Sequence, residues 1–285
     1  MRTVKKAPKG KFKEGFARVL FLLAACVSIL AVVLICVFLL ANGIPAIREV
    51  GLFKFLSGKV WRPGNDIYGI LPMIVGSLYI TAGAILFGVP TGILTALYLS
   101  RFASRPAAKI LNPAVELLAG IPSVVYGFFG LVVIVPVLGS SILTASILLG
   151  IMILPTIITV AKSSLDAVPQ PYYEGALALG ATHERSVFKI LFPAARSGVL
   201  AGVVLGIGRA IGETMAVMMV AGNQPRITGN LLKGIRTLTT NIVLEMGYAA
   251  DLHREVLIAT ALVLFVFILL LNLSFSALKR RSESV

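Results

Sequence analysis

Charged residues are scarce in this sequence: Asp, Glu, Lys and Arg make up 13% of its 285 residues, against roughly 25% in an average soluble domain. Three long stretches without a charge, 67–100, 117–161 and 256–278, contain 34, 45 and 23 residues. About 20 apolar residues suffice for a helix to cross a bilayer. Because backbone polar groups in lipid must be paired within the segment, continuous apolar runs of this length indicate membrane-spanning helices.

Residues that bind metals or form disulfides are also few. There are two histidines, His183 and His253, and two cysteines, Cys26 and Cys36. The cysteines are ten residues apart in one apolar run, about 15 Å along a helix, which is too far for a disulfide. No Cys/His grouping and no H-E-x-x-H pattern occurs, so we expect no metal site.

The ATP-binding P-loop, G-x-x-x-x-G-K-[ST], is missing as well. The stretch from Gly206 through Gly208 to Gly212 differs from the dinucleotide-binding fingerprint by one residue and falls inside an apolar run. We therefore expect that this chain binds no cofactor of its own and is not an enzyme.

The apolar runs predict an all-α membrane protein with six transmembrane helices. The third and fourth helices share one run, which we divide at Pro136 and the turn residues 139–141. Pro90, Pro122 and Pro155 then lie inside three of the helices, where neighbouring helices in a packed bundle can accommodate them. The predicted spans are 19–42, 75–100, 110–136, 141–162, 198–221 and 256–278.

Lysine and arginine are unequally divided between the two sides of the membrane. A basic N-terminal tail (1–18), the 101–109 loop, the 162–197 segment and a C-terminal tail (279–285) hold 17 of them, and the loops on the other side hold eight. Positive charge collects on the cytoplasmic side of membrane proteins, so we expect a multi-pass protein of the cell membrane with both termini in the cytoplasm. The net charge of +14 then reflects topology, and we expect no nucleic-acid partner.

The 162–197 segment is long for a connection between two membrane helices. Pro169 and Pro171 open it, and Pro193 closes it. Between them, small and apolar residues at 174–182 predict a short helix. So short a helix has little room to bury its apolar surface within one chain, so it either lies on the membrane surface or docks a soluble partner.

Two charges, Arg209 and Glu213, fall inside the fifth predicted span. A charge at mid-bilayer costs roughly 2.5–3.5 kcal/mol on an insertion scale, so such groups normally face the protein interior or water. Three glycines share their helix face, within about 80° of arc at 100° per residue, and small residues at this spacing permit close helix packing. These are Gly198, Gly202 and Gly206. The charges either neutralise each other as an i,i+4 structural pair or line a translocation path, where Arg209 favours an anion.

The cytoplasmic segment carries a spaced pattern of five residues, Glu174, Ala176, Gly180, Ile190 and Pro193. The pattern resembles the EAA loop of permease subunits of type I ABC importers, E-A-A-x3-G-x9-I-x-L-P, with Gly175 in place of the first Ala and Phe192 in place of Leu. The resemblance implies the MetI-like fold of these permeases, with a cytoplasmic coupling helix that docks on a separate ATPase. It implies an ATPase-coupling loop at about 163–197 with these residues: Glu174, Gly175, Ala176, Gly180, Ala181, Ile190 and Pro193.

Three further stretches narrow the resemblance: Y-G-I-L-P at 68–72, G-I-P-S-V-V-Y-G at 120–127 and G-R-A-I-G-E-T-M-A-V at 208–217. Together they resemble the PstC-type permeases of phosphate-specific ABC importers, over roughly residues 50–280. A guanidinium such as that of Arg209 offers planar, charge-assisted donors to phosphate oxygens. The candidate phosphate path consists of Arg209, Glu213, Thr214, Ser123 and Tyr126.

The same resemblance implies an assembly around a permease domain at 19–278. A homologous, PstA-like permease would complete the path, and two copies of a PstB-like ATP-binding subunit would use ATP. An extracytoplasmic, PstS-like phosphate-binding protein would deliver inorganic phosphate to the 43–74 and 222–255 segments.

Other assignments stay open from the sequence. The chain could be a type I ABC permease for another oxyanion, such as sulfate or molybdate, or the PstA-like partner. An ion-coupled secondary transporter should show inverted repeats with broken helices, and we find no convincing repeat. A purely structural membrane scaffold predicts that Arg209 and Glu213 are dispensable. Ser123 could hydrogen-bond a carbonyl freed by Pro122 instead of meeting substrate.

Overall fold

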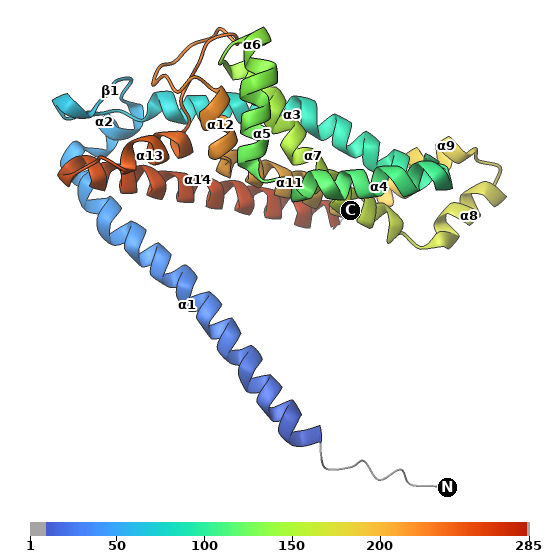
Figure 1. Cartoon of the computed structure of the whole chain (residues 1–285). Coiled ribbons are helices and arrows are strands. Elements are labelled where there is room, and N and C mark those ends of the chain that lie inside the picture. The colour runs from blue at the N-terminus through green and yellow to red at the C-terminus, as the bar shows by residue number, and fades with distance from the viewer. Residues whose placement is uncertain (1–9, 284–285) are drawn as a thin grey trace.

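The structure is a computed structural model that describes residues 10–283, with side chains at 15–274 and 277. Residues 1–9 of the expected basic tail and 284–285 of the C-terminal tail lie outside the described residues. The described chain is almost entirely helical, with one small hairpin (Figure 1). Its two strands, β1 (Trp61–Arg62) and β2 (Ile67–Tyr68), pair antiparallel.

The helices, in chain order, are α1 (Gly10–Val50), α2 (Leu52–Ser57), α3 (Leu71–Leu97), α4 (Arg105–Gly120), α5 (Ser123–Phe129), α6 (Val135–Leu138), α7 (Ile142–Asp166), α8 (Gln170–Ala178), α9 (His183–Ser186), α10 (Phe192–Ala194), α11 (Arg196–Gly212), α12 (Met215–Val220), α13 (Leu238–Met246) and α14 (Asp251–Glu283). Four short turns of tighter or wider helix join them: η1 (Pro63–Asn65), η2 (Tyr98–Phe102), η3 (Gly130–Ile134) and η4 (Val187–Leu191). Helices α1 and α14 continue into the segments expected as tails, at 10–18 and 279–283.

Within the described residues, four helices are long and apolar enough to cross a membrane: Gly15–Val50, Leu71–Phe102, Ile142–Asp166 and Asp251–Ser274. Two bent pairs bring the number to six if each counts as one span: Arg105–Gly120 with Ser123–Leu138, and His183–Ala194 with Arg196–Gly212. The all-α membrane class is thus confirmed, and the six predicted spans correspond to these four helices and two pairs.

The third predicted span, at 110–136, is not one helix. The chain bends by 98° between the helices that end at Gly120 and begin at Ser123. Pro122 has no N–H for a helical hydrogen bond, and a proline pushes the residue before it toward extended backbone. Ile121 accordingly has φ −70° and ψ 125°. The expectation that Pro122 sits inside a spanning helix is therefore wrong.

The fifth predicted span, at 198–221, is interrupted as well. Helix α11 ends at Gly212, and Glu213 has an extended backbone with φ −67° and ψ 131°. A new helix, α12, begins at Met215. Glu213 therefore does not continue the glycine face of α11, and the prediction that it shares this face is wrong.

The core is built where α3 and α11 pack on α7. At six glycines, a Cβ atom would lie only 2.2–3.1 Å from an α7 side chain, so any side chain there would force the helices apart. Close packing of small residues is a principal source of helix association in lipid. Three of these glycines lie on α3 (Gly83, Gly88 and Gly92) and three on α11 (Gly198, Gly202 and Gly206), which confirms the predicted glycine stripe.

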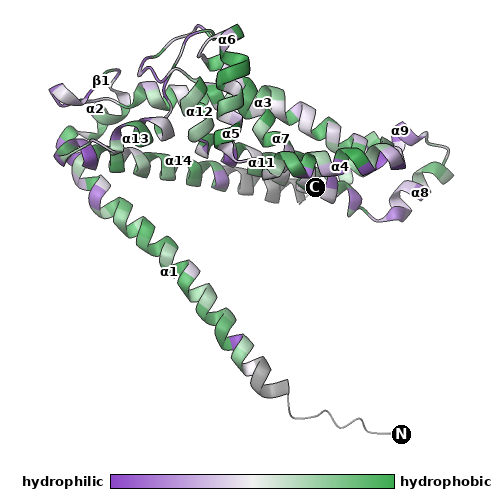
Figure 2. Ribbon diagram, viewed as in Figure 1, coloured by the Kyte–Doolittle hydropathy of each residue, from purple (hydrophilic) through white to green (hydrophobic). Residues whose placement is uncertain are grey.

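Opposite ends of the bundle carry different structures (Figure 1). At one end, α2, the hairpin and α13 fold into a cap in which Phe55, Trp61 and Tyr68 join Leu238 and Val256 in one buried cluster. At the other end, α8 and α9 project from the bundle (Figure 1). Helix α1 leaves the bundle at the cap (Figure 1), and its surface is apolar along most of its length (Figure 2). Its most apolar window has no buried residue, which leaves it free to contact lipid or another subunit.

The glycine stripe can be tested with two alanine substitutions on one helix. A Cβ at Gly206 would lie 2.8 Å from Ile157, whereas a Cβ at Gly208 would meet nothing within 4 Å. We expect Gly206→Ala to destabilise the protein by about 1–3 kcal/mol through overpacking. Gly208→Ala should be neutral or slightly stabilising, because alanine favours a helix by about 1 kcal/mol over glycine. Thermal unfolding in detergent measures both, and equal midpoints would contradict this packing.

Candidate substrate path and coupling loop

The predicted coupling helix is present, but it lies earlier than expected. Helix α8 starts after Pro169, has Pro171 in its first turn and ends at Ala178, so the prediction of a helix at 174–182 is wrong in its second half. Gly180 stops the helix with φ 84°, a left-handed conformation that glycine adopts without strain.

The hydrogen bonds around Gly180 explain why the pattern contains a glycine there. The Gly180 N–H donates to the Leu177 carbonyl (2.9 Å), and the Ala181 N–H donates to the Ala176 carbonyl (3.1 Å). This pair of bonds is the Schellman motif, which satisfies the last carbonyls of a helix. Gly180 therefore supplies the left-handed residue that ends α8, and the Ala181 N–H makes the outer hydrogen bond of the cap.

The second half of the coupling loop is anchored in the bundle. Ile190 lies in η4 and Pro193 in α10. The neighbouring Val187 and Leu191 are fully buried in a cluster that also holds Leu165 of α7. The loop is thus packed against the ends of α7 and α11.

Helix α8 buries one side and exposes apolar side chains on another. Ala176 is 5% exposed, while Leu179 is 91% and Tyr172 57% exposed. Glu174 and Gly175 are also exposed. An exposed apolar surface on a projecting helix is typical of a protein contact.

A histidine to which the sequence assigned no role holds the two halves of the loop together. The His183 Nδ1 atom and the Tyr173 hydroxyl are 2.8 Å apart. The His183 ring also stacks edge-on against Phe102 of η2, with 4.8 Å between ring centroids. This role of His183 is visible only in the structure, because no sequence pattern links residues 102, 173 and 183.

Arg209 lies on the contact between α11 and α7. Its Nη1 atom donates to the Thr156 hydroxyl at 3.3 Å, and the side chain is half-buried. Thr156 directly follows Pro155 in α7 and was not among the predicted path residues. In the sequence, Thr156 stands out only as a polar residue within an apolar run.

Glu213 makes its hydrogen bonds to other parts of the chain than Arg209 does. Its carboxylate accepts from the Ala216 N–H of α12 (3.2 Å), and its carbonyl accepts from the Thr239 hydroxyl (3.1 Å). Among the described residues, Glu213 and Arg209 form no ion pair. The i,i+4 structural pair considered from the sequence is absent there because α11 ends at Gly212, one residue before Glu213.

The other three predicted path residues lie at or just after the two helix breaks. Thr214 follows Glu213 and donates to the Gly212 carbonyl (3.2 Å). Ser123 is the first residue of α5, and within the described chain its hydroxyl makes no hydrogen bond, so it does not cap a carbonyl freed by Pro122. Tyr126 donates to the Leu118 carbonyl across the bend (2.8 Å).

The two breaks come together in space. A Cβ atom on Gly127 of α5 would lie 2.9 Å from the Cα atom of Ala216 in α12, so the helices that follow the breaks are packed together. The fold therefore packs the helices that follow the two breaks against each other, and Arg209 lies four residues before the second break.

Comparison with known proteins identifies the class. Residues 88–284 match the family described as "Binding-protein-dependent transport system inner membrane component". The fold is similar to a chain of the inward-facing MetNI methionine ABC transporter, with a TM-score of 0.63 and 19% identity over 78% of this chain and 99% of that one. A chain of a bacterial alginate ABC transporter also has a TM-score of 0.63, with 19% identity over 94% of this chain and 96% of that one. The chain belongs to this family of ABC-transporter permeases, and the predicted MetI-like fold is confirmed.

Two curated relatives are similar at the level of sequence. The chain is 36% identical to the probable ABC transporter permease protein YqgH of Bacillus subtilis, over 95% of this chain and 94% of that protein. It is also 36% identical to the phosphate transport system permease protein PstC of Mesorhizobium japonicum, over 77% of this chain and 76% of that protein.

The end of α8 gives a testable prediction about the coupling loop. Replacing Gly180 by alanine forces a left-handed backbone on a residue with a Cβ, at a cost of roughly 1–2 kcal/mol. We expect the Gly180→Ala variant to exchange the amide hydrogens of 180 and 181 about tenfold faster, since 1.4 kcal/mol corresponds to a factor of ten. Gly175→Ala, in the middle of the same helix with open space around it, is the matched control and should slow exchange in α8. Unchanged exchange in Gly180→Ala would disprove the capping role.

Proposed function

We propose that this chain is the transmembrane permease subunit of an ATP-driven importer of inorganic phosphate. The observation that carries the proposal is Arg209, held by Thr156 of α7 four residues before the helix break at Glu213. A guanidinium binds phosphate oxygens through planar, charge-assisted hydrogen bonds. The PstC proteins among its relatives are named as phosphate permeases, which favours phosphate over sulfate or molybdate.

Coupling to ATP would occur through α8. The sequence has no P-loop, so ATP would be bound and hydrolysed by separate, PstB-like subunits, present in two copies. Their docking surface would be the exposed side chains of Tyr172 and Leu179. Because the loop is packed against α7 and α11, a push on α8 would reach the helix that carries Arg209.

The orientation follows from the same assignment. The end of the bundle with α8 and α9 would face the cytoplasm, and the last turns of α14 lie toward that end (Figure 1). The cap formed by α2, the hairpin and α13 would then face outward and receive a PstS-like phosphate-binding protein. A PstA-like permease would complete the path, and the chain would lie in the cell membrane with both termini in the cytoplasm.

Broken helices also occur in ion-coupled secondary transporters, so the breaks alone do not decide the energy source. Family membership and the capped coupling loop favour an ATP-driven importer. Phosphate uptake driven by an ion gradient in proteoliposomes that hold only this chain would overturn the proposal.

Phosphate uptake by the assembled transporter tests the role of Arg209. We expect Arg209→Gln to lower uptake at least about tenfold, because a hydrogen bond to a charged group is worth roughly 1.5–3 kcal/mol. Thr156→Val keeps the guanidinium and removes only the hydroxyl that positions it, so the loss of uptake should be smaller than in Arg209→Gln. Competition with sulfate and molybdate checks selectivity. Normal uptake by Arg209→Gln, or equal competition by sulfate, would refute the phosphate path.

Copurification of the ATPase tests the coupling loop. Ala176 is buried, so Ala176→Trp should displace α8 and abolish ATPase association while the chain still inserts in the membrane. Gly180→Asp should also abolish ATPase association, because it disrupts the C-terminal cap of α8. Gly175→Ala, which restores the residue of the family pattern, should retain wild-type association. Wild-type levels of ATPase with Ala176→Trp would refute the docking assignment.

A further inference from the structure

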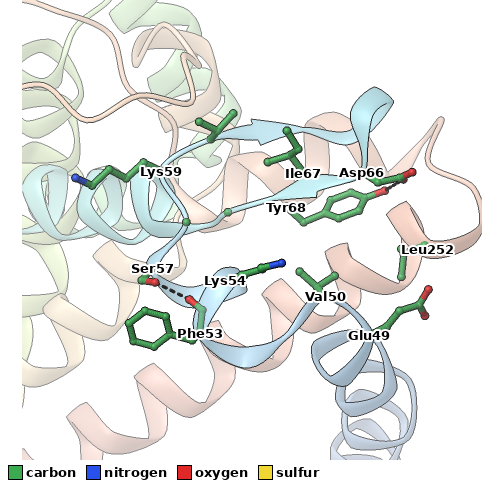
Figure 3. A pocket seen from close by; sticks show the side chains of 13 residues that line it. Glu49, Val50, Phe53, Lys54, Ser57, Lys59, Asp66, Ile67, Tyr68 and Leu252 are labelled. Atoms are coloured by element: carbon green, nitrogen blue, oxygen red, sulfur yellow. Dashed lines mark hydrogen bonds between the residues drawn. The ribbon is translucent and has the colours of Figure 1, made fainter.

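A cavity of about 820 Å³ opens in the cap, between α2, the hairpin and the first turn of α14 (Figure 3). Val50, the last residue of α1, and Leu252, in the first turn of α14, both line it. These residues lie at the ends of two of the helices that are long and apolar enough to cross a membrane. A cavity at these helix ends would lie near the membrane surface, at the end of the bundle away from α8 (Figure 1).

The wall beside this cavity is apolar and faces outward. Phe53 of α2 lines the cavity and is 84% exposed, and its neighbour Leu52 is 58% exposed. Phe55, on the other face of α2, is fully buried. Helix α2 is thus a short amphipathic helix at a span end, with its outer face suited to the boundary between headgroups and acyl chains.

Opposite charges line the cavity without neutralising each other. Glu49 and Asp66 lie on one side of it, and the Lys54 ammonium projects toward its middle (Figure 3). Among the described residues none of these three side chains forms an ion pair. Asp66 accepts one hydrogen bond, from the Tyr68 hydroxyl at 3.2 Å.

The two carboxylates act together on Tyr68. Burial raises the pKa of its phenol, and the hydrogen bond to Asp66 and the charges of Asp66 and Glu49 raise that pKa further. One side of the cavity is therefore negative, while Lys54 makes its middle positive. Lys59 also lines the cavity, but its ammonium points away from the carboxylates (Figure 3).

We propose that this cavity binds the headgroup of a phospholipid that carries a primary amine, such as phosphatidylethanolamine. The lipid phosphate would bind Lys54, and the ammonium would donate hydrogen bonds to Glu49 and Asp66. The acyl chains would run beside Phe53 and α1. A choline headgroup has no N–H to donate, and a glycerol headgroup has no positive charge, so neither satisfies both halves of the cavity. The site does not depend on the identity of the transported anion.

Native mass spectrometry of the assembled transporter tests the proposal. The complex is extracted from nanodiscs that contain equal amounts of phosphatidylethanolamine, phosphatidylcholine and phosphatidylglycerol, and the retained lipids are counted. We expect wild type to retain phosphatidylethanolamine preferentially. Lys54→Gln should lower that retention about fivefold or more, as expected for the loss of about 1 kcal/mol. Glu49→Gln combined with Asp66→Asn should remove the preference over phosphatidylcholine.

The matched control is Arg62→Gln, which removes a positive charge from the exposed face of β1 outside the cavity lining, and it should retain lipid like wild type. Copurified ATPase confirms that each variant is assembled. Equal retention of phosphatidylcholine by wild type overturns the proposal, and so does a Lys54→Gln variant that matches Arg62→Gln. Preferential retention of phosphatidylglycerol overturns the amine assignment. Protection of Lys54 from acylation in detergent only when the phosphate-binding protein is added would show that a protein segment occupies the cavity instead.

Discussion

Ile157, in the middle of α7, is fully buried and touches the positions where α3 and α11 have no side chain, Gly92 and Gly206. In lipid there is no hydrophobic force to press helices together, so the close approach at such glycines must supply the contact energy. The glycine face of α11 also fixes the rotation of that helix about its axis. Arg209, three residues beyond Gly206, then reaches Thr156, the neighbour of Ile157 in α7.

Helix α11 joins the two regions of the chain to which we assign a function. Its first turn continues from the coupling loop, where Leu191 and Val199 share a buried cluster with Leu165. Its last turn carries Arg209, about 20 Å farther along at 1.5 Å per residue. A helix with a continuous backbone ladder moves as a rod over this length. Displacement of the coupling loop would therefore reach the guanidinium directly, while the break at Glu213 leaves α12 free to respond separately.

The sequence predicted those features that follow from periodicity and spacing. The glycine stripe repeats at the helical period and was confirmed. The five spaced residues at 174–193 predicted a short helix, which is present but begins earlier and ends at Ala178, and its role in coupling stays a prediction. The break at Pro122 was missed because membrane helices often tolerate proline, as α7 does at Pro155. The break at Glu213 was missed because its carbonyl is bound by the hydroxyl of the distant Thr239, a contact that no local pattern predicts. Thr156 was missed for the same reason: its role depends on a residue 53 positions away.

A density map of the assembled transporter, trapped with phosphate by an ATPase that binds but does not hydrolyse ATP, tests the account most directly. The account predicts phosphate within hydrogen-bond distance of the Arg209 guanidinium, beside the breaks at 121–122 and 213–214. Phosphate bound elsewhere in the membrane, with Arg209 still held only by Thr156, would contradict it.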